Sequence, residues 1–437
     1  MDPKASFIFT GDSFITKRLP YCDNNGFFEG FTEISEVIKH YDVRFNNLET
    51  TVHYNEGYPE AVSGGTWAMS KPEVLDALTD YGFNILNTAN NHSMDYGHGG
   101  LLATIENLKM RNIAFAGTGK NLHEASKPAY LETKNARVAM IGVCSSFSEN
   151  SPAGNQRFDF GGRPGLNPLR FRTVYNIKSE HFGALQEIAG ITGVNAGKLK
   201  SIKNGYAPPL KEGELPFGNL SFKLSDKNET LTYPNQKDTE RIAGYIEEAK
   251  RQADYCFVSL HAHEFRDGDS AKPALFLEEF SRTCIDRGAD AVVGHGPHEL
   301  RPIEIYKGKP IFYSLGNFIF QTEIIDYQPA DAYENHDMPN TTTVGQYMDK
   351  RSQNGTRGYG VQPKIWESVM AGLTMEAGKA VGIKLYTIDL HMEYPRSRKG
   401  FPTLRNDDGV LKYLCELSTP YGTKMKINDG IATIDLI

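Results

Sequence analysis

The 437-residue sequence is poor in cysteine and has neither a long apolar run nor a run of basic residues. Its longest apolar stretches, such as Ile311 to Phe320, are far shorter than the about 20 residues that a membrane span requires, so we expect no membrane span in this chain. No Cys-x-x-C pair occurs, which argues against a zinc ribbon or a structural zinc site. The five scattered cysteines favour reduced thiols over a disulfide scaffold: Cys22, Cys144, Cys256, Cys284 and Cys415.

The N-terminus lacks the features of an export signal. It shows no basic segment followed by an apolar core, because residues Ser6 to Gly11 already have the pattern of a short strand. Together with the reduced cysteines, this favours the cytoplasm. An exported protein whose signal had been removed would have the same N-terminus.

The sequence also has fewer basic residues than acidic ones. The formal net charge is -7 and the isoelectric point is near 6.0, with no basic stripe along the chain. This balance argues against nucleic acid as an obligatory partner. The composition of 39% hydrophobic and 23% charged residues is ordinary for a globular enzyme, and it leaves the oligomeric state open.

Short apolar runs alternate with segments of helical period, which predicts a layered α/β fold. A capping box at Ser70 to Glu73 predicts the start of a helix, and Gly99 to Arg111 has leucine and isoleucine at helical spacing. Further helices are expected over 237–253, 273–287 and near 410–417. The predicted strands are 6–10, 43–48, 84–88, 113–116, 137–143, 255–260, 289–294, 303–306, 310–315, 368–375 and 380–390.

The pattern degrades between about residues 150 and 235, where glycine, proline, asparagine and lysine dominate. Only Phe182 to Ile191 resembles a helix there. A segment this long is more often a functional insertion or lid than a passive linker. We therefore predict a catalytic domain over residues 1–320 with this insertion, and an extension over 321–437.

Polar residues gather directly after five of the predicted strands, where open α/β sheets collect ligand-binding groups. Each segment alone has a plainer interpretation, since a single aspartate there is more often a helix N-cap. The joint pattern is less easily explained that way, because five of the twelve histidines fall in three of the segments. The five segments are Thr10 to Asp12, Asn46 to Glu49, Asn87 to His92 with Asp95, His261 to Glu264, and Gly294 to His298.

Mixed carboxylate, amide and imidazole groups of this kind predict a site for divalent metal ions such as Mn, Zn, Fe, Mg or Ca. Two ions about 3.5–4 Å apart, joined by a carboxylate, would activate a shared water molecule. Glu49 is the best candidate for the bridge. His92 is the best candidate for a histidine that binds no metal and protonates a leaving group.

At these residues the sequence resembles the CapA family, named for poly-gamma-glutamate capsule synthesis, which is similar to the calcineurin-type metallophosphoesterases. The resemblance implies an α/β/β/α sandwich of the metallophosphoesterase type, with an inserted lid and a C-terminal β-rich extension. It also implies a small or peptide-like anionic substrate. The matching stretches are GDSF (11–14), NNLET (46–50), NTANNHSMDYGHGGL (87–101), FAGTG (115–119), VSLHAHEF (258–265) and DAVVGHGPHELRPIEIYKGKPIFYSLGNFIF (290–320).

Carried over position by position, the resemblance implies a site for two metal ions and a catalytic set of Asp12, His92 and His295. The phosphoesterase D-x-H motif ends here in Phe14, so one ligand is missing; either His263 replaces it or one of the two ions binds weakly. The final H-x-H motif has become H-x-x-H. The implied metal ligands are Asp12 and His298 for the first ion, Glu49 as the bridge, and Asn91, His261 and His295 for the second.

Four other residues are candidates for contacts with substrate. Trp67 could form an aromatic wall, although a role in the core is equally compatible with its position. Arg163 could reach a substrate carboxylate or phosphate from the insertion, although a plain loop arginine is the simpler interpretation. Asn90 and Glu264 adjoin predicted ligands.

These features favour a metal-dependent hydrolase that uses a metal-activated water on a phosphoester or on a gamma-glutamyl or peptide-like amide. One alternative keeps the metals but makes the protein a peptide epimerase or isomerase, with Asp12 and a histidine as acid and base. The other is a non-catalytic accessory component of polymer synthesis.

Overall fold

The computed structural model describes residues 4–17 and 30–436, so Cys22 lies outside the described residues. Its largest sheet has ten strands, eight of them on one main path. The other two branch from that path: β21 (Asn317–Phe320) pairs with β1, and β24 (Thr403–Leu404) pairs with β23. Along the main path the order is β25 (Lys426–Asn428), β26 (Ile431–Asp435), β23 (Lys379–Asp389), β22 (Glu367–Glu376), β1 (Lys4–Phe14), β2 (Val43–Leu48), β5 (Ile85–Asn87) and β6 (Ala114–Ala116). A second sheet of six strands has the order β19 (Leu300–Tyr306), β20 (Lys309–Leu315), β18 (Ala291–His295), β15 (Tyr255–His261), β9 (Arg137–Cys144) and β8 (Ala129–Glu132).

The two sheets face one another across an apolar core. Phe9 of the first sheet contacts Phe257 of the second, with ring centroids 5.2 Å apart, and Phe312 lies 5.9 Å from Phe9. Alternate residues of the same strands point outward and pack on helices. Ile8 does so on the outer face of the first sheet, and Val258 does so on the outer face of the second. Because each strand is covered on both faces, its sequence is a nearly continuous apolar run.

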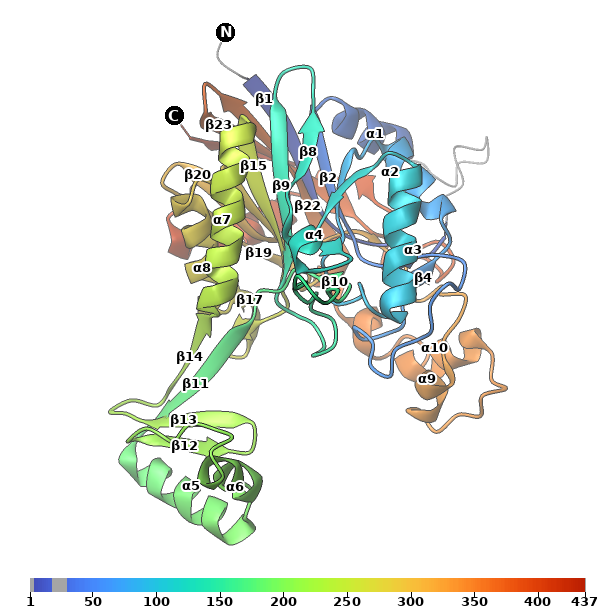
Figure 1. The fold of residues 1–437 in the computed structure, drawn as a ribbon. Coiled ribbons are helices and arrows are strands. Elements are labelled where there is room, and N and C mark those ends of the chain that lie inside the picture. The colour runs from blue at the N-terminus through green and yellow to red at the C-terminus, as the bar shows by residue number, and fades with distance from the viewer. Residues whose placement is uncertain (1–3, 18–29, 437) are drawn as a thin grey trace.

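Helices cover both outer faces (Figure 1). This arrangement of helices outside two facing sheets confirms the predicted α/β fold class. On the ten-stranded sheet lie α1 (Phe31–Lys39) and α2 (Glu73–Tyr81), and α3 (Gly97–Met110) follows β5. On the six-stranded sheet lie α7 (Gln236–Gln252) and α8 (Leu275–Asp286).

One predicted local feature is wrong. The helix after Ser70 does begin as α2, but its N-cap is Pro72 and no side chain caps it. Ser70 instead lies in β4 (Met69–Ser70) and shares a hydrogen bond of 2.9 Å with Thr50. The tertiary contact therefore uses the hydroxyl group that the capping box would need.

The insertion is more regular than the sequence suggested. Its first part stays on the body, where β10 (Gly165–Leu166) pairs with β7 (Thr118–Gly119). The rest projects as an arm (Figure 1) made of a four-stranded sheet and two helices, whereas we predicted a single helix. The strands were missed because most of their side chains are partly or fully exposed and form no apolar run. The arm contains β12 (Glu214–Phe217), β13 (Leu220–Leu224), β11 (Phe171–Ile177), β14 (Glu229–Pro234), α5 (Ser179–Thr192) and α6 (Ala196–Lys203).

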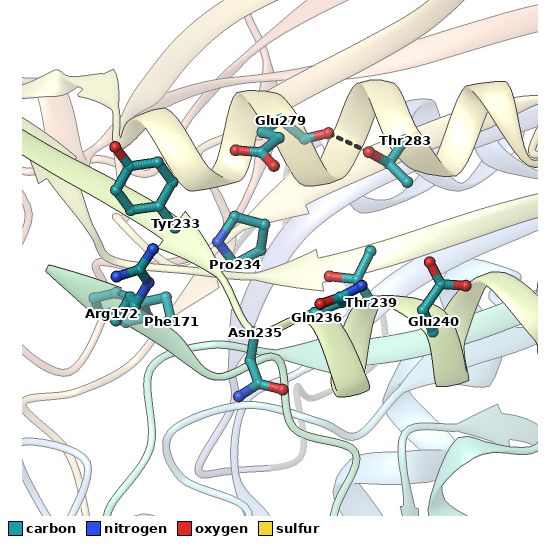
Figure 2. A pocket seen from close by; sticks show the side chains of 10 residues that line it. All are labelled: Phe171, Arg172, Tyr233, Pro234, Asn235, Gln236, Thr239, Glu240, Glu279 and Thr283. Carbon is teal, nitrogen blue, oxygen red and sulfur yellow. Dashed lines mark hydrogen bonds between the residues drawn. The ribbon is translucent and has the colours of Figure 1, made fainter. Parts of the chain in front are cut away.

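A groove of about 570 Å³ lies where the arm joins the body (Figure 2). The guanidinium of Arg172 lies 4.6 Å from the ring centroid of Tyr233 on its wall. Glu240 and Glu279 also line the groove, so it presents both signs of charge. It contains none of the predicted site residues.

The C-terminal part of the chain joins the first sheet. β22 runs antiparallel to β1, with Phe7 opposite Leu373, and β23 follows as the next strand. Before them lies a lobe with α9 (Ala330–Glu334) and α10 (Val344–Ser352), which the sequence analysis did not predict, and after them comes α11 (Asp408–Ser418). Within the described ranges, no helix has both the length and the apolar character that crossing a membrane requires.

Candidate metal centre

The predicted strand-end residues come together because the strands that carry them are parallel. Asp12 of β1 lies beside Asn47 of β2 in the register of the first sheet. In the second sheet, His261 of β15 lies beside His295 of β18. Since the two sheets face each other, both pairs lie at one edge of the sandwich.

Five ionisable side chains meet at this edge. Asp12 Oδ1 lies 3.5 Å from His295 Nδ1 and 3.7 Å from His261 Nδ1. Glu49 Oε1 lies 3.7 Å from His261 Nε2, so the two ring nitrogens of His261 face two different carboxylates. His298 Nδ1 lies 3.7 Å from Asp12 Oδ2 and 3.8 Å from Glu49 Oε2. Metal–ligand bonds of about 2.0–2.2 Å place neighbouring ligand atoms about 3–4 Å apart, so this spacing fits a bound cation.

The side chains form three overlapping groups whose ligand atoms lie within 4.8 Å of one another. His263 belongs to one of them, and its Nε2 lies 3.2 Å from His261 Nε2. The groups overlap because they share Asp12, Glu49 and His261, so together they form one continuous centre. The groups are Asp12, His261 and His295; Glu49, His261 and His263; and Asp12, Glu49 and His298.

The loop after β18 contains two residues with positive φ, which bring it close to the other strand-end segments. Gly296 has φ +116°, and a Cβ there would lie 3.0 Å from the amide nitrogen of Ala262. Its own amide donates a hydrogen bond of 2.8 Å to Asp12 Oδ2. His298 is held at φ 61°, an uncommon conformation for a residue with a side chain and one that concentrates at functional sites.

A surrounding set of hydrogen bonds orients the centre. Asn47 donates to Asp12 Oδ1 at 2.7 Å, and Ser259 Oγ lies 2.7 Å from His295 Nε2. Asn317 Oδ1 lies 2.9 Å from His298 Nδ1. The guanidinium of Arg301, fully buried, donates to the His263 carbonyl at 3.0 Å. Such partners fix the rotamers of metal ligands.

Sequence reasoning missed the roles of these supporting residues. Asn47 lies in one of the five strand-end segments but received no role of its own, and Ser259 lies inside an apolar strand. For Ser259 the available signal was a single hydroxyl two residues before His261, on the same side of the strand. Arg301 carried no signal, because an arginine at the start of a strand is usually exposed.

The pKa values of the two carboxylates are shifted in opposite directions. Burial alone would raise the pKa of Asp12, but hydrogen bonding and charge from His295, charge from His298 and the Gly296 amide outweigh it and lower that pKa. Burial, followed by the negative charges of Asp12 and Asp95, raises the pKa of Glu49 well above its ordinary value. Both Glu49 carboxylate oxygens are buried and have no hydrogen-bond partner among the described residues.

The pKa values of His261, His263 and His298 are lowered, which favours their neutral forms. Burial, aided by the neighbouring imidazoles, lowers the pKa of His261 well below its ordinary value. Burial and the charge of His298 lower the pKa of His263 to about 3. Burial also lowers the pKa of His298, although Asp12 opposes it. Neutral imidazole is the form that binds metal, so these rings and the unpartnered Glu49 carboxylate fit a divalent ion.

His92 lies beside the centre with its own carboxylate partner. His92 Nδ1 lies 2.6 Å from Asp95 Oδ2, and both residues are buried. The same Asp95 accepts hydrogen bonds from the amides of Gly64 and Ala68, at 2.9 and 2.7 Å. The carboxylate therefore fixes the imidazole through Nδ1, as in other His–Asp pairs, and leaves Nε2 for chemistry.

Two asparagines beside His92 have different surroundings. Asn91 donates from Nδ2 to the Gly64 carbonyl at 2.7 Å, which leaves its Oδ1 buried and without a partner in the described part of the chain. An amide oxygen in that state can ligate a cation. Asn90 is occupied by backbone, since Nδ2 donates to the Leu48 carbonyl at 2.8 Å and Oδ1 accepts from the His92 amide at 3.1 Å.

Phe14, at the position of the lost D-x-H histidine, packs in an apolar cluster with Phe320 and Trp366. Its ring meets the ring of His92 edge-on, with centroids 5.2 Å apart. This position is therefore a wall of the centre and supplies no ligand. His263 and His298, with ring centroids 5.6 Å apart, belong to the centre and lie in loops that follow strands of the second sheet.

The remaining candidates lie at varying distances from the centre. Trp67 is buried in the cluster of Tyr347 and its neighbours, and its Nε1 donates to the Glu60 carbonyl at 2.7 Å. Glu264 accepts hydrogen bonds from Ser145 and Ser146, at 2.7 and 2.9 Å. Arg163 is exposed and donates to the Pro152 carbonyl, so the structure does not bring it into the cluster.

The fold and the cluster define a class of protein: an α/β sandwich with a buried centre of carboxylates and imidazoles suited to divalent cations. The profile of the family described as "Bacterial capsule synthesis protein PGA_cap" matches residues 6–322. The chain therefore belongs to this family, which lies in the metallophosphoesterase-like superfamily. The resemblance inferred from the motifs is confirmed.

Relatives align over much of the chain. The uncharacterized protein y4sH of Sinorhizobium fredii (strain NBRC 101917 / NGR234) is 33% identical over 99% of this chain and 93% of its own length. The PGA biosynthesis protein CapA of Bacillus subtilis (strain 168) is 26% identical over 73% of this chain and 64% of its own length. The probable polyglutamine synthesis accessory protein Rv0574c of Mycobacterium tuberculosis (strain ATCC 25618 / H37Rv) is 25% identical over 64% and 55%, respectively.

Proposed function

We propose that this protein is a metal-dependent hydrolase, with two divalent ions, that acts on a phosphoester or on a gamma-glutamyl or peptide-like amide in polyglutamate or capsule metabolism. One observation carries the proposal: Glu49 is fully buried, with no hydrogen-bond partner for either carboxylate oxygen among the described residues. An isolated buried carboxylate is costly, and a metal cation is the partner that the surrounding imidazoles can share with it.

The proposed ligands are the carboxylates and imidazoles that meet around Glu49, together with Asn91, which the family resemblance implies as a ligand. The oxygen ligands come from the first sheet and its loops, and the nitrogen ligands come from the second sheet. When bound, the ions would supply a Lewis acid and lower the pKa of a bound water. The set is Asp12, Glu49, Asn91, His261, His263, His295 and His298.

His92 has the proposed role of proton donor to the leaving group. Asp95 fixes the ring through Nδ1, so the opposite nitrogen can carry the proton that a departing alkoxide or amine needs. Phe14 packs against the same ring and limits its rotation. Asp12 is less suited to the epimerase alternative, because its neighbours lower its pKa and make it a weak base.

The domain organisation follows the same proposal. We infer a catalytic unit over residues 1–320 that has the metallophosphoesterase type of sandwich, with residues 150–235 as an inserted lid. Residues 321–437 would complete the sandwich, which is supported by the antiparallel pairing of β22 with β1.

Metal analysis and an activity panel test the proposal together. Purified protein should bind up to two equivalents of Mn or Zn, with anomalous scattering peaks beside Asp12 and His295. It should then cleave either bis(p-nitrophenyl) phosphate or tri-gamma-glutamate in a metal-dependent way. Fewer than one equivalent of metal, with no peak beside those residues, would overturn it.

A second candidate function is supported by the names of relatives. The mycobacterial relative is described as a probable accessory protein of polyglutamine synthesis, which suggests a supporting role without catalysis. Under this alternative, cells carrying Asp12→Ala and His295→Ala variants would make polymer normally. Loss of polymer with a folded variant protein would exclude it.

A further inference from the structure

A pocket of about 260 Å³ lies beside the loop that contains Gly64, and Gly65 is one of its lining residues. Gly65 and Trp67 form one wall, and Tyr347 and Arg351 of α10 form the other. Pockets that enclose whole drug-sized ligands measure about 300–1,000 Å³. This pocket is therefore large enough for one unit of a longer molecule.

The pocket is electropositive, although the whole chain is acidic. The guanidinium of Arg351 and the ring of His336 line it, and none of its described lining residues is acidic. Arg351 makes only a long contact of 3.4 Å to the Gly65 carbonyl and has no ion pair with a described carboxylate. A guanidinium without a carboxylate partner among the described residues, beside neutral donors such as Asn335, is suited to an anion.

The same loop is bonded to the candidate metal centre. The Gly64 carbonyl accepts from Asn91 at 2.7 Å, and the Gly64 amide donates to Asp95 at 2.9 Å. Tyr359 provides a second link, since its ring meets the ring of His298 with centroids 6.2 Å apart. The phenol of Tyr359 is within electrostatic range of both Arg351 and Glu49.

We propose that this pocket is a carboxylate subsite, in which Arg351 binds an anionic group of the substrate one unit away from the bond that the metal centre cleaves. This inference rests on the proposed function and decides between its two substrate classes in favour of the peptide-like one. A single guanidinium matches a carboxylate through two parallel hydrogen bonds. The aromatic walls of Trp67 and Tyr347 suit the methylene groups of an acidic amino-acid unit.

Calorimetric titration of the full-length protein with tri-gamma-glutamate tests the subsite. Arg351→Gln should weaken binding roughly 10- to 100-fold, because a charge-assisted pair is lost. The matched control Arg357→Gln removes the same charge from an exposed position nearby and should change affinity less than about twofold. An analogue of tri-gamma-glutamate with amides in place of the free carboxylates should bind weakly to the wild type, to Arg351→Gln and to Arg357→Gln.

Three results would overturn the subsite. Affinity for tri-gamma-glutamate could be unchanged in Arg351→Gln, or the amide analogue could bind the wild type equally well. Inorganic phosphate could also bind with the stronger dependence on Arg351, which would make the site one for phosphate.

The same titrations in the Glu49→Gln protein separate this inference from the proposed function. Glu49→Gln should abolish hydrolysis and retain binding that depends on Arg351. Hydrolysis that survived Glu49→Gln would contradict the proposed function alone. Binding that ignored Arg351 would contradict the subsite alone.

Discussion

Two regions of this molecule bring together the same kinds of side chain, yet only one has the character of a metal site. The C-terminal group of Asp389, His391 and Glu393 satisfies the same ligand spacing as the centre around Asp12 and Glu49. Its members are partly or fully exposed, whereas the carboxylates of the centre are fully buried. The difference shows that residue type and spacing alone do not define a site.

The C-terminal group has its polar atoms occupied within the protein. Asp389 accepts from the His391 amide at 2.8 Å and pairs with Arg405 at 3.1 Å. His391 Nε2 lies 2.9 Å from Thr403 Oγ1, and its ring stacks on Tyr394 with centroids 4.4 Å apart. No cation is needed there. At the centre, by contrast, the Glu49 carboxylate has no hydrogen-bond partner in the described part of the chain.

The largest expected effect comes from removing Asp12. Asp12→Asn should abolish metal binding and lower metal-dependent hydrolysis by at least roughly 10⁴-fold, because the activated water is lost. The matched variant Asp389→Asn should retain full metal content and activity. Metal analysis by mass spectrometry and initial rates with either panel substrate measure both. If Asp12→Asn and Asp389→Asn lost equal amounts of metal and activity, the two regions would not differ as metal sites.

His92 is expected to matter for chemistry and not for metal content. His92→Asn should lower kcat about 10²–10³-fold, since a proton donor contributes that much. Metal content should stay unchanged, and His391→Asn should be indistinguishable from wild type. A variant that lost metal along with activity would make His92 a ligand, contrary to the proposed role.

Asn47 tests whether the hydrogen bonds around Asp12 preorganise the centre. Asn47→Ala removes the 2.7 Å hydrogen bond to Asp12 and should weaken metal binding about 10- to 100-fold, as loss of a supporting residue typically does. Thr403→Ala, which removes the partner of His391, should leave metal affinity unchanged. Competition with a fluorescent chelator gives both affinities. Wild-type affinity in Asn47→Ala would show that Asp12 needs no such support.

The sequence predicted the centre better than its surroundings, for a physical reason. Candidate ligands such as His295 follow apolar strands in short recognisable segments, so their clustering could be inferred from topology. Arg301 and Ser259 act through distant contacts that depend on how the two sheets pack, and no local pattern records them. The arm strands were missed for a related reason, because most of their side chains are exposed and carry little apolar periodicity.

The smallest expected effect concerns stability without metal. In metal-free protein the pKa of Glu49 is raised well above its ordinary value of 4.5. A group with a raised pKa in the folded state stabilises the fold below its unfolded pKa, and that contribution is lost as pH rises through the folded pKa. Metal-free wild type should therefore lose stability as the pH rises above about 4.5, the ordinary pKa of glutamate, and added metal should restore it.

Glu49→Gln isolates this effect, because glutamine keeps the shape and cannot ionise. At pH 8 in chelator, the free energy of unfolding in urea should be higher for Glu49→Gln than for wild type by about 1–3 kcal/mol. At pH 5 the two should converge, and metal should stabilise only the wild type. Glu393→Gln, at the exposed end of the C-terminal group, should show no such difference at either pH. If Glu49→Gln behaved like Glu393→Gln, the Glu49 carboxylate would already be neutralised within the protein, and its need for a cation would disappear.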